Sequence, residues 1–146
     1  MDSIEGVVVT PLKIIENPKG DIYHFLKKSD NTFTSFGEAY FSSINENEIK
    51  GWKKHSIMKL NIVVPIGEIM FVLYDDRVES TSNGNFCALK ISKTNYCRLT
   101  VPPGVWMAFK GIGAGTNLLM NIASIPHDPN ESENCGIESF NFNWGK

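Results

Sequence analysis

Short segments that alternate apolar and polar residues dominate the chain. Tyr23 and Phe25 fall on one face of an extended segment, and His24 and Leu26 fall on the other. This period of two is that of a β-strand, and no amphipathic helix longer than two turns is expected. The pattern predicts strands within residues 6–15, 20–28, 38–44, 60–75, 86–92, 97–103, 105–111 and 117–125.

Turn-forming residues separate these segments, as in "NPKGD", "IGE", "STSNGNF" and "PPGV". Pro65 has no N–H to donate to a neighbouring strand, so it predicts a break or bulge before Gly67. Evenly spaced strands without helices are typical of a β-sandwich, jelly roll or barrel, and 146 residues suit one domain spanning 1–146. The alternation of Phe140, Phe142 and Trp144 predicts a last edge strand.

Composition narrows the class of protein. The net charge is −2, which gives no general reason to expect binding to nucleic acid or to an anionic membrane. Three cysteines without C-x-x-C spacing indicate reduced thiols. The first residues show neither the basic and apolar regions of a signal peptide nor a membrane anchor, so a cytoplasmic location is expected.

The segment "GWKKH" at 51–55 places cations around one histidine. Alternation puts Lys53, His55 and Ile57 on one face of an extended chain, and Lys54 and Ser56 on the other. Two interpretations follow. Either Lys53 and His55 line a pocket, or the cluster is the solvated beginning of a strand.

Five segments in order resemble a known family. They are "PLKIIENPKGDIYHF", "IKGW", "VPIGEIMFVLYDDR", "LTVPPGVWMAF" and "NIASIPHDPNE". Together they resemble the dTDP-4-dehydrorhamnose 3,5-epimerase family, a cupin-like jelly roll, over residues 6–131. The resemblance implies a homodimer that acts on a nucleotide sugar, a dTDP- or other NDP-4-keto-6-deoxyhexose, without a cofactor, in deoxysugar or surface polysaccharide biosynthesis. Epimerisation or isomerisation then proceeds by proton abstraction beside the ketone.

Three positions depart from the family pattern. Lys53 stands where the family has its catalytic histidine, and His55 lies two residues further on. The alignment places Met120 at the catalytic tyrosine and Met107 at the histidine of the Pro-x-Gly segment. The fold and the binding of a sugar nucleotide are therefore expected to carry over more fully than the chemistry.

The candidate catalytic residues are His55, Lys53 and Tyr40. Chemistry beside a ketone needs a base, a group that stabilises the enolate oxygen, and an acid. His55 suits the base, and the positive charge of Lys53 favours its neutral, proton-accepting form. Lys53 could also hold the enolate oxygen or act as the base itself. Tyr40 could supply the acid, although a packed tyrosine with a satisfied hydroxyl is the alternative.

The candidate binding residues are cationic or aromatic. The resemblance places Lys19 and Lys50 where the family uses arginines to hold the diphosphate, which keeps the charge but loses the two-pronged guanidinium. Lys59 points either into the same cavity or into water. Trp52 and Trp106 could stack on a base or sugar, although a buried core is the commoner place for tryptophan.

The segment "IPHDPNE" favours a structural turn, with His127 as a second candidate near the pocket rim. No spacing among His24, His55 and His127 supports a metal site. The glycines of "GIGAG" at 111–115 lack the strand-then-helix context of a dinucleotide site and predict a loop.

Three functions remain open from the sequence. The first is a nucleotide-sugar epimerase or ketoisomerase. The second is a catalytically degenerate cupin that binds a nucleotide sugar or other small molecule without turnover, which the substitutions at Lys53 and Met120 favour. The third is a structural or assembly protein.

Overall fold

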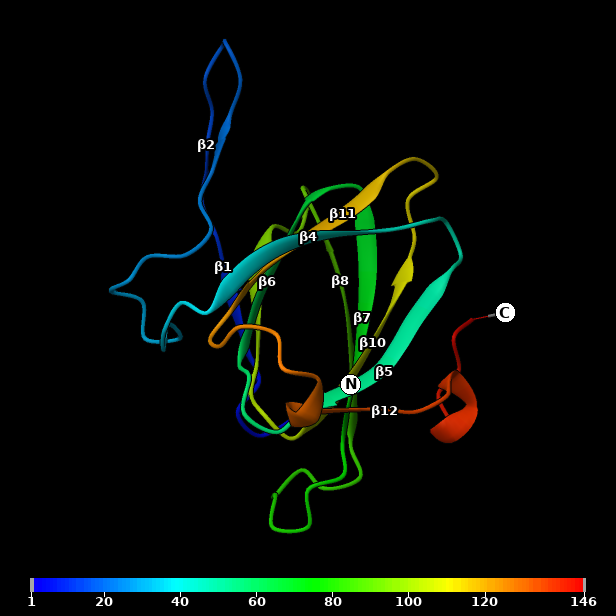
Figure 1. Ribbon diagram of the computed structural model, residues 1–146. Helices are drawn as coiled ribbons and strands as arrows, with labels where there is room; N and C mark the ends of the chain where they lie inside the picture. Colours follow the sequence, from blue (N-terminus) through cyan, green and yellow to red (C-terminus); the bar gives the residue numbers. More distant parts are fainter. Residues whose placement is uncertain (1, 146) are drawn as a thin grey trace.

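Two five-stranded antiparallel sheets face each other in the computed structural model, which describes residues 2–145 (Figure 1). The first sheet has the order β1-β9-β6-β11-β4, and the second has the order β12-β5-β10-β7-β8. A separate hairpin, β2 and β3, projects beside them. The strands are β1 (Val8–Pro11), β2 (Ile14–Ile15), β3 (Ile22–Tyr23), β4 (Glu38–Ile44), β5 (Ile49–His55), β6 (Leu60–Ile66), β7 (Glu68–Asp75), β8 (Phe86–Ser92), β9 (Cys97–Val101), β10 (Val105–Gly111), β11 (Asn117–Ala123) and β12 (Ser132–Asn134).

The predicted all-β class is confirmed, with local differences. The segment 6–15 divides into β1 and β2, and within 20–28 only Ile22–Tyr23 is a strand. The segment 60–75 divides at Gly67, where φ is +79°, a backbone conformation that favours glycine. The bulge predicted from Pro65 is present, since the pairing of β6 with β11 shifts register between Leu118 and Met120.

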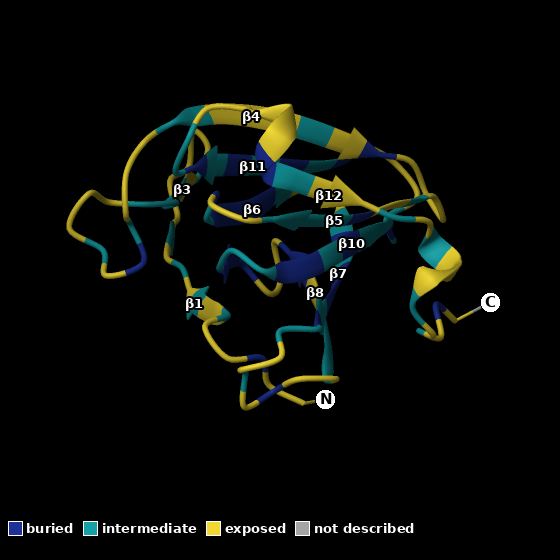
Figure 2. Ribbon diagram, turned by 60° about the horizontal axis from the view of Figure 1, so that its bottom comes forward, coloured by how far each residue is buried: buried dark blue, intermediate teal, exposed yellow. Residues whose placement is uncertain are grey.

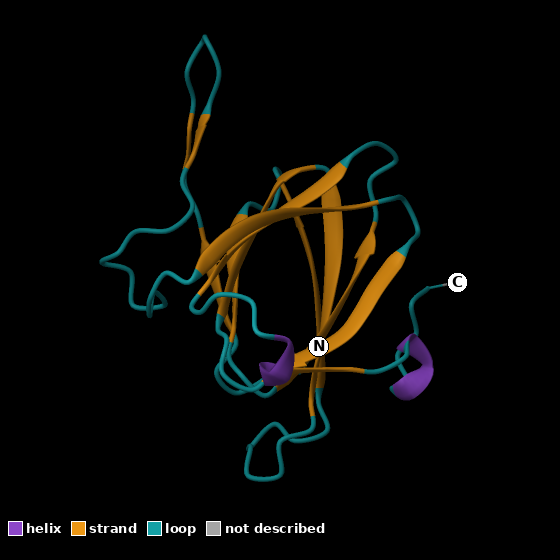
Figure 3. Ribbon diagram, in the orientation of Figure 1, coloured by secondary structure: helices purple, strands orange, loops and turns teal. Residues whose placement is uncertain are grey.

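Two short 3-10 turns flank β12 (Figure 3). The first, η1 (Pro129–Glu131), begins at Asp128, whose side chain caps it by accepting a hydrogen bond from the Asn130 amide at 2.9 Å. The turn predicted for "IPHDPNE" is therefore correct. The second is η2 (Ile137–Ser139). No helix within residues 2–145 has the length and apolar character needed to cross a membrane.

The main core lies between the two sheets, where the inward positions of the central strands are almost fully buried (Figure 2). Alternate residues of β6 and β10 reach it, including Ile62, Val64 and Val105. Strand β4, at the edge of the first sheet, is mostly exposed. The inward faces therefore build one apolar interior, and an open edge remains on one side.

A second, aromatic cluster covers the outer face of the second sheet. Trp52 of β5 is fully buried there, with its ring centroid 5.3 Å from that of Phe140 and 5.9 Å from that of Trp144. The C-terminal segment thus packs across the sheet, and the edge strand predicted for Phe140, Phe142 and Trp144 is wrong. The edge strand is β12, and large aromatic rings make the later residues a cover for Trp52 instead.

Candidate active site

A cavity of about 210 Å³ opens between the two sheets. Its wall is largely apolar, with side chains from β6, β9 and β10, and its polar groups come from only a few positions. Among the described residues no carboxylate lines it, whereas two lysines do, so the cavity suits an anionic ligand. The polar lining residues are Tyr40, Lys50, Lys53, His55 and Asn134.

Strand β5 supplies the basic side of the cavity. Lys53 and His55 both line it, as alternation from Lys53 predicts. Lys50 is three residues from Lys53 and would face the other way in a regular strand. The pairing of β5 with β10 shifts register between Met107 and Phe109, and this irregularity brings Lys50 to the same cavity.

His55 is held by a carboxylate from another part of the chain. Its Nδ1 forms a hydrogen bond with Oε1 of Glu131, the last residue of η1. The other oxygen of Glu131 accepts the amide hydrogens of Ile57 at 3.0 Å and Met58 at 3.1 Å. Both carboxylate oxygens are therefore used, and Glu131 fixes the ring of His55.

The charge of Glu131 decides the tautomer of His55. Burial raises the pKa of the Glu131 carboxyl, but hydrogen bonds from His55, Met58 and Ile57 outweigh it, and the pKa lies below its ordinary value. An ionised carboxylate only accepts hydrogen bonds, so His55 donates through Nδ1. In the neutral ring Nε2 is then the acceptor, which is the arrangement a general base needs.

Tyr40 stands on the first sheet, in β4, and lines the same cavity. Its hydroxyl oxygen accepts a hydrogen bond from Nδ2 of Asn121 at 3.2 Å. Asn121 belongs to β11 and is fully buried. The outward residue beside it is Met120, paired with Phe41, so the inward position near Tyr40 belongs to Asn121. The cavity thus has a histidine on one sheet and a phenol on the other.

The two lysines of the cavity differ in their partners. Lys50 Nζ donates to the Ser43 carbonyl of β4 at 2.6 Å and lies 3.3 Å from Ser42 Oγ, so it bridges the two sheets beside the cavity. No carboxylate within residues 2–145 forms an ion pair with Lys53. The Lys53 ammonium is thus available to a ligand.

Known proteins share this architecture. A crystal structure of a dTDP sugar isomerase from Desulfovibrio desulfuricans G20 is 35% identical, with a TM-score of 0.90, over 93% of this chain and 87% of that one. The chain therefore belongs to the dTDP-4-dehydrorhamnose 3,5-epimerase-like family. It is an enzyme of the epimerase and isomerase type, with the family's cupin-like jelly roll.

Two curated relatives of this epimerase-like enzyme are more distant. The "Probable low-salt glycan biosynthesis epimerase Agl13" of Haloferax volcanii is 25% identical over 130 residues, 88% of this chain and 83% of the relative. The "Spore coat polysaccharide biosynthesis protein SpsL" of Bacillus subtilis is 24% identical over 145 residues, 97% of this chain and 96% of the relative. No family model matches the chain.

Two expected binding residues of the epimerase-like enzyme lie outside the cavity. Trp52 is fully buried in the outer aromatic cluster, and its Nε1 donates to the Ile137 carbonyl at 3.1 Å. Trp106 is 5% exposed on the same outer face, with Nε1 bonded to Asp76 Oδ2 at 2.8 Å. The prediction that they stack on a ligand is therefore wrong for both residues. Each is adjacent in its strand to a cavity residue, Lys53 or Met107, so alternation turns it to the opposite face.

Three further candidates are not among the residues that line the cavity. Lys19 lies in the turn of the projecting β2–β3 hairpin, where its amide donates to Asn17 Oδ1 (Figure 1). Lys59 Nζ lies 3.2 Å from Thr34 Oγ1 on the surface. His127 is exposed just before η1. Within this chain, the structure does not bring any of the three to His55.

Sequence reasoning missed Glu131 and Asn134. The segment "PNE" predicted a turn, and only the packing of η1 against β5 shows that the turn aims a carboxylate at His55. Asn134 reaches the cavity because β12 pairs with β5 opposite Lys53. No cluster of three or more His, Cys, Asp or Glu that could hold a metal occurs within residues 2–145.

Proposed function

We propose that the enzyme epimerises or isomerises a nucleoside-diphosphate 4-keto-6-deoxyhexose, with a dTDP sugar as the first substrate to test. The His55–Glu131 pair carries this proposal, because it places an oriented imidazole in a cavity lined by two lysines. The names of the relatives support a role in deoxysugar or polysaccharide biosynthesis.

Each polar group has a proposed role. His55 Nε2 takes the proton from the carbon beside the ketone, and Glu131 keeps the ring in place. The ammonium of Lys53 stabilises the oxygen of the resulting enolate. Tyr40, on the other sheet, returns a proton to the enolate from the opposite side, and solvent then restores both protonation states. Lys50, the second lysine of the cavity, attracts the diphosphate.

The test is exchange of solvent deuterium into 4-keto-6-deoxy nucleotide sugars by wild type, His55→Asn and Lys53→Met. Wild type is expected to exchange, and His55→Asn to exchange about 10²–10⁴-fold more slowly, the usual contribution of a positioned general base. Equal exchange by His55→Asn excludes His55 as the base.

Thermal unfolding with a panel of nucleotides and nucleotide sugars separates binding from chemistry. A ligand at a hundred times its Kd adds about 2.7 kcal/mol to the free energy of unfolding. A sugar that binds without exchange in wild type supports the degenerate cupin instead. If no sugar binds or exchanges, the proposal is abandoned.

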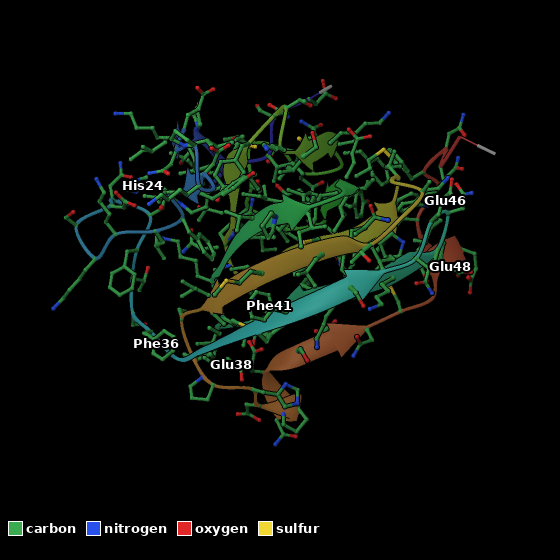
Figure 4. All side chains as sticks on the ribbon, turned by 90° about the horizontal axis from the view of Figure 1, so that it is seen from above. His24, Phe36, Glu38, Phe41, Glu46 and Glu48 are labelled. Atoms are coloured by element: carbon green, nitrogen blue, oxygen red, sulfur yellow. The ribbon has the colours of Figure 1, made fainter. Side chains whose placement is uncertain are left out.

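We also propose that the protein is a cytoplasmic homodimer. The three cysteines are all free, which suits a reducing compartment. Phe36 and Phe41 are 66% and 63% exposed beside the open edge of β4, as Figure 4 shows from that side, and a second copy could cover them. The C-terminal aromatic residues do not support a dimer, since they pack within the chain. Light scattering that gives the 16.3 kDa of one chain at micromolar concentration excludes the dimer.

A further inference from the structure

A buried amide lies behind Tyr40. Asn121 is fully buried, and a buried amide costs free energy unless both of its polar atoms are hydrogen bonded. Both are. Oδ1 of Asn121 accepts the backbone N–H of Asn61 at 3.1 Å, and Nδ2 donates to the hydroxyl oxygen of Tyr40 at 3.2 Å.

The first of these bonds fixes the orientation of the amide. Oxygen and nitrogen of a side-chain amide are often interchangeable, and the hydrogen-bond network has to assign them. The N–H of Asn61 can only donate, so Oδ1 of Asn121 must face it and Nδ2 must face Tyr40. Asn61 is itself held, because Thr100 Oγ1 donates to its Oδ1 at 2.6 Å and its Nδ2 donates to the Thr32 carbonyl at 3.2 Å.

This orientation sets the direction of the bond to Tyr40. The phenol oxygen accepts the hydrogen bond from Asn121 and does not donate in it, so the hydroxyl hydrogen of Tyr40 is available to a second partner. Tyr40 lines the cavity, so a ligand bound there is within reach of this hydroxyl as its second partner. A donor to the phenol oxygen also stabilises the phenolate that remains after proton transfer.

We propose that Asn121 is a positioning residue that makes Tyr40 a proton donor toward the cavity. The proposal rests on the proposed function in so far as the acceptor is an enolate. The polarity of the Asn121–Tyr40 bond does not depend on which substrate binds, so it can be measured without one.

The test uses Asn121→Leu, which is similar in size and cannot donate. Met120→Leu is the matched control, because Met120 is the adjacent residue of β11 and points outward. The first readout is the titration midpoint of Tyr40, followed by NMR of ¹³C-labelled tyrosine. Loss of one hydrogen bond to the phenolate is expected to raise the midpoint by about half to one pH unit in Asn121→Leu and to leave it unchanged in Met120→Leu.

The second readout is turnover of the sugar. Product formation by Asn121→Leu is expected to fall about three- to tenfold, the rate equivalent of that shift, while His55-dependent deuterium exchange continues. The double variant Tyr40→Phe/Asn121→Leu is expected to be no slower than Tyr40→Phe, since Asn121 acts through Tyr40.

A folded Asn121→Leu with an unchanged Tyr40 midpoint overturns the proposal, as does a double variant much slower than Tyr40→Phe. Where circular dichroism shows that Asn121→Leu does not fold, Asn121→Ser replaces it, because serine is too short to reach Tyr40. A raised midpoint in an enzyme that turns over no sugar upholds the polarity of Tyr40 and removes only the proposed function.

Discussion

The two faces of β5 carry opposite kinds of side chain. Lys53 and His55 face the cavity, where the neighbouring strand β10 contributes Met107. The ammonium of Lys53 is available there to an anionic ligand. Trp52 and Lys54 face outward, where the C-terminal segment seals the tryptophan from water and Lys54 lies 3.4 Å from Asp76. One strand therefore places its chemistry on one side and much of its packing on the other.

The contrast between the two faces of β5 shows how well the alternation of side chains along a strand predicts their positions. A period of two separates Lys53 from Lys54 correctly, and it also turns Trp52 away from His55. The same rule places Trp52 on the outer face of β5, away from any ligand in the cavity. Changes on the outer face should then alter stability more than chemistry, and changes on the inner face should do the reverse.

The largest expected effect on stability is that of Trp52→Ala. The side chain is fully buried and holds the C-terminal segment, so its truncation should lower the free energy of unfolding by about 3–5 kcal/mol. Urea unfolding followed by circular dichroism measures this loss. A decrease below about 1 kcal/mol would show that the outer cluster does not hold the fold.

Glu131→Gln should have the next largest effect. Glutamine replaces one carboxylate oxygen by an NH₂ group, which cannot accept a hydrogen bond from the donors that face Glu131. About 1–3 kcal/mol of stability should therefore be lost at pH 7. The pKa of Glu131 in the fold lies below its ordinary value of 4.5. Its contribution is therefore complete above that ordinary value and is lost as the pH falls through the lower folded pKa.

Unfolding of wild type and Glu131→Gln between pH 3 and pH 7 measures this contribution. The difference between them should shrink toward the acid end. A constant difference across the range would mean that the charge of Glu131 contributes nothing.

Much of the fold could be predicted from the sequence, because period two, glycine turns and Pro65 are local signals. The same alternation places Lys53 and His55 on one face of β5, and the packing of the two sheets turns that face toward the cavity. Glu131 could not be predicted, since it lies 76 residues from His55 and reaches it only through η1 and β12. Lys50 enters the cavity through an irregularity in the β5–β10 pairing that alternation does not contain. Long-range packing and irregular pairing thus set the details of the site.

Trp106→Phe should have a smaller effect on the outer face. The substitution keeps an aromatic ring and removes the hydrogen bond to Asp76. Bonds to charged groups contribute about 1.5–3 kcal/mol, and the partial exposure of Asp76 reduces the expected loss to about 1 kcal/mol. Urea unfolding measures it. Deuterium exchange should match wild type, and slower exchange would link the outer cluster to the chemistry.

The smallest effect on stability, and the sharpest test of the two faces, comes from adjacent lysines given the same substitution. Lys54→Met removes a partly exposed ion pair with Asp76 and a cation–π contact 4.8 Å from the Trp106 ring, so stability should change by about 0–1 kcal/mol. Its deuterium exchange should equal that of wild type, because Lys54 does not reach the cavity.

Lys53→Met removes the same positive charge from the chain, but this charge lies in the cavity. Its deuterium exchange should therefore slow, while its stability stays within the same range. Equally slowed exchange in the two variants would mean that total charge matters and the face of the strand does not, and wild-type exchange in both would mean that Lys53 takes no part in the reaction. Slower exchange in Lys53→Met alone assigns the effect to position, because the two variants have the same composition and net charge.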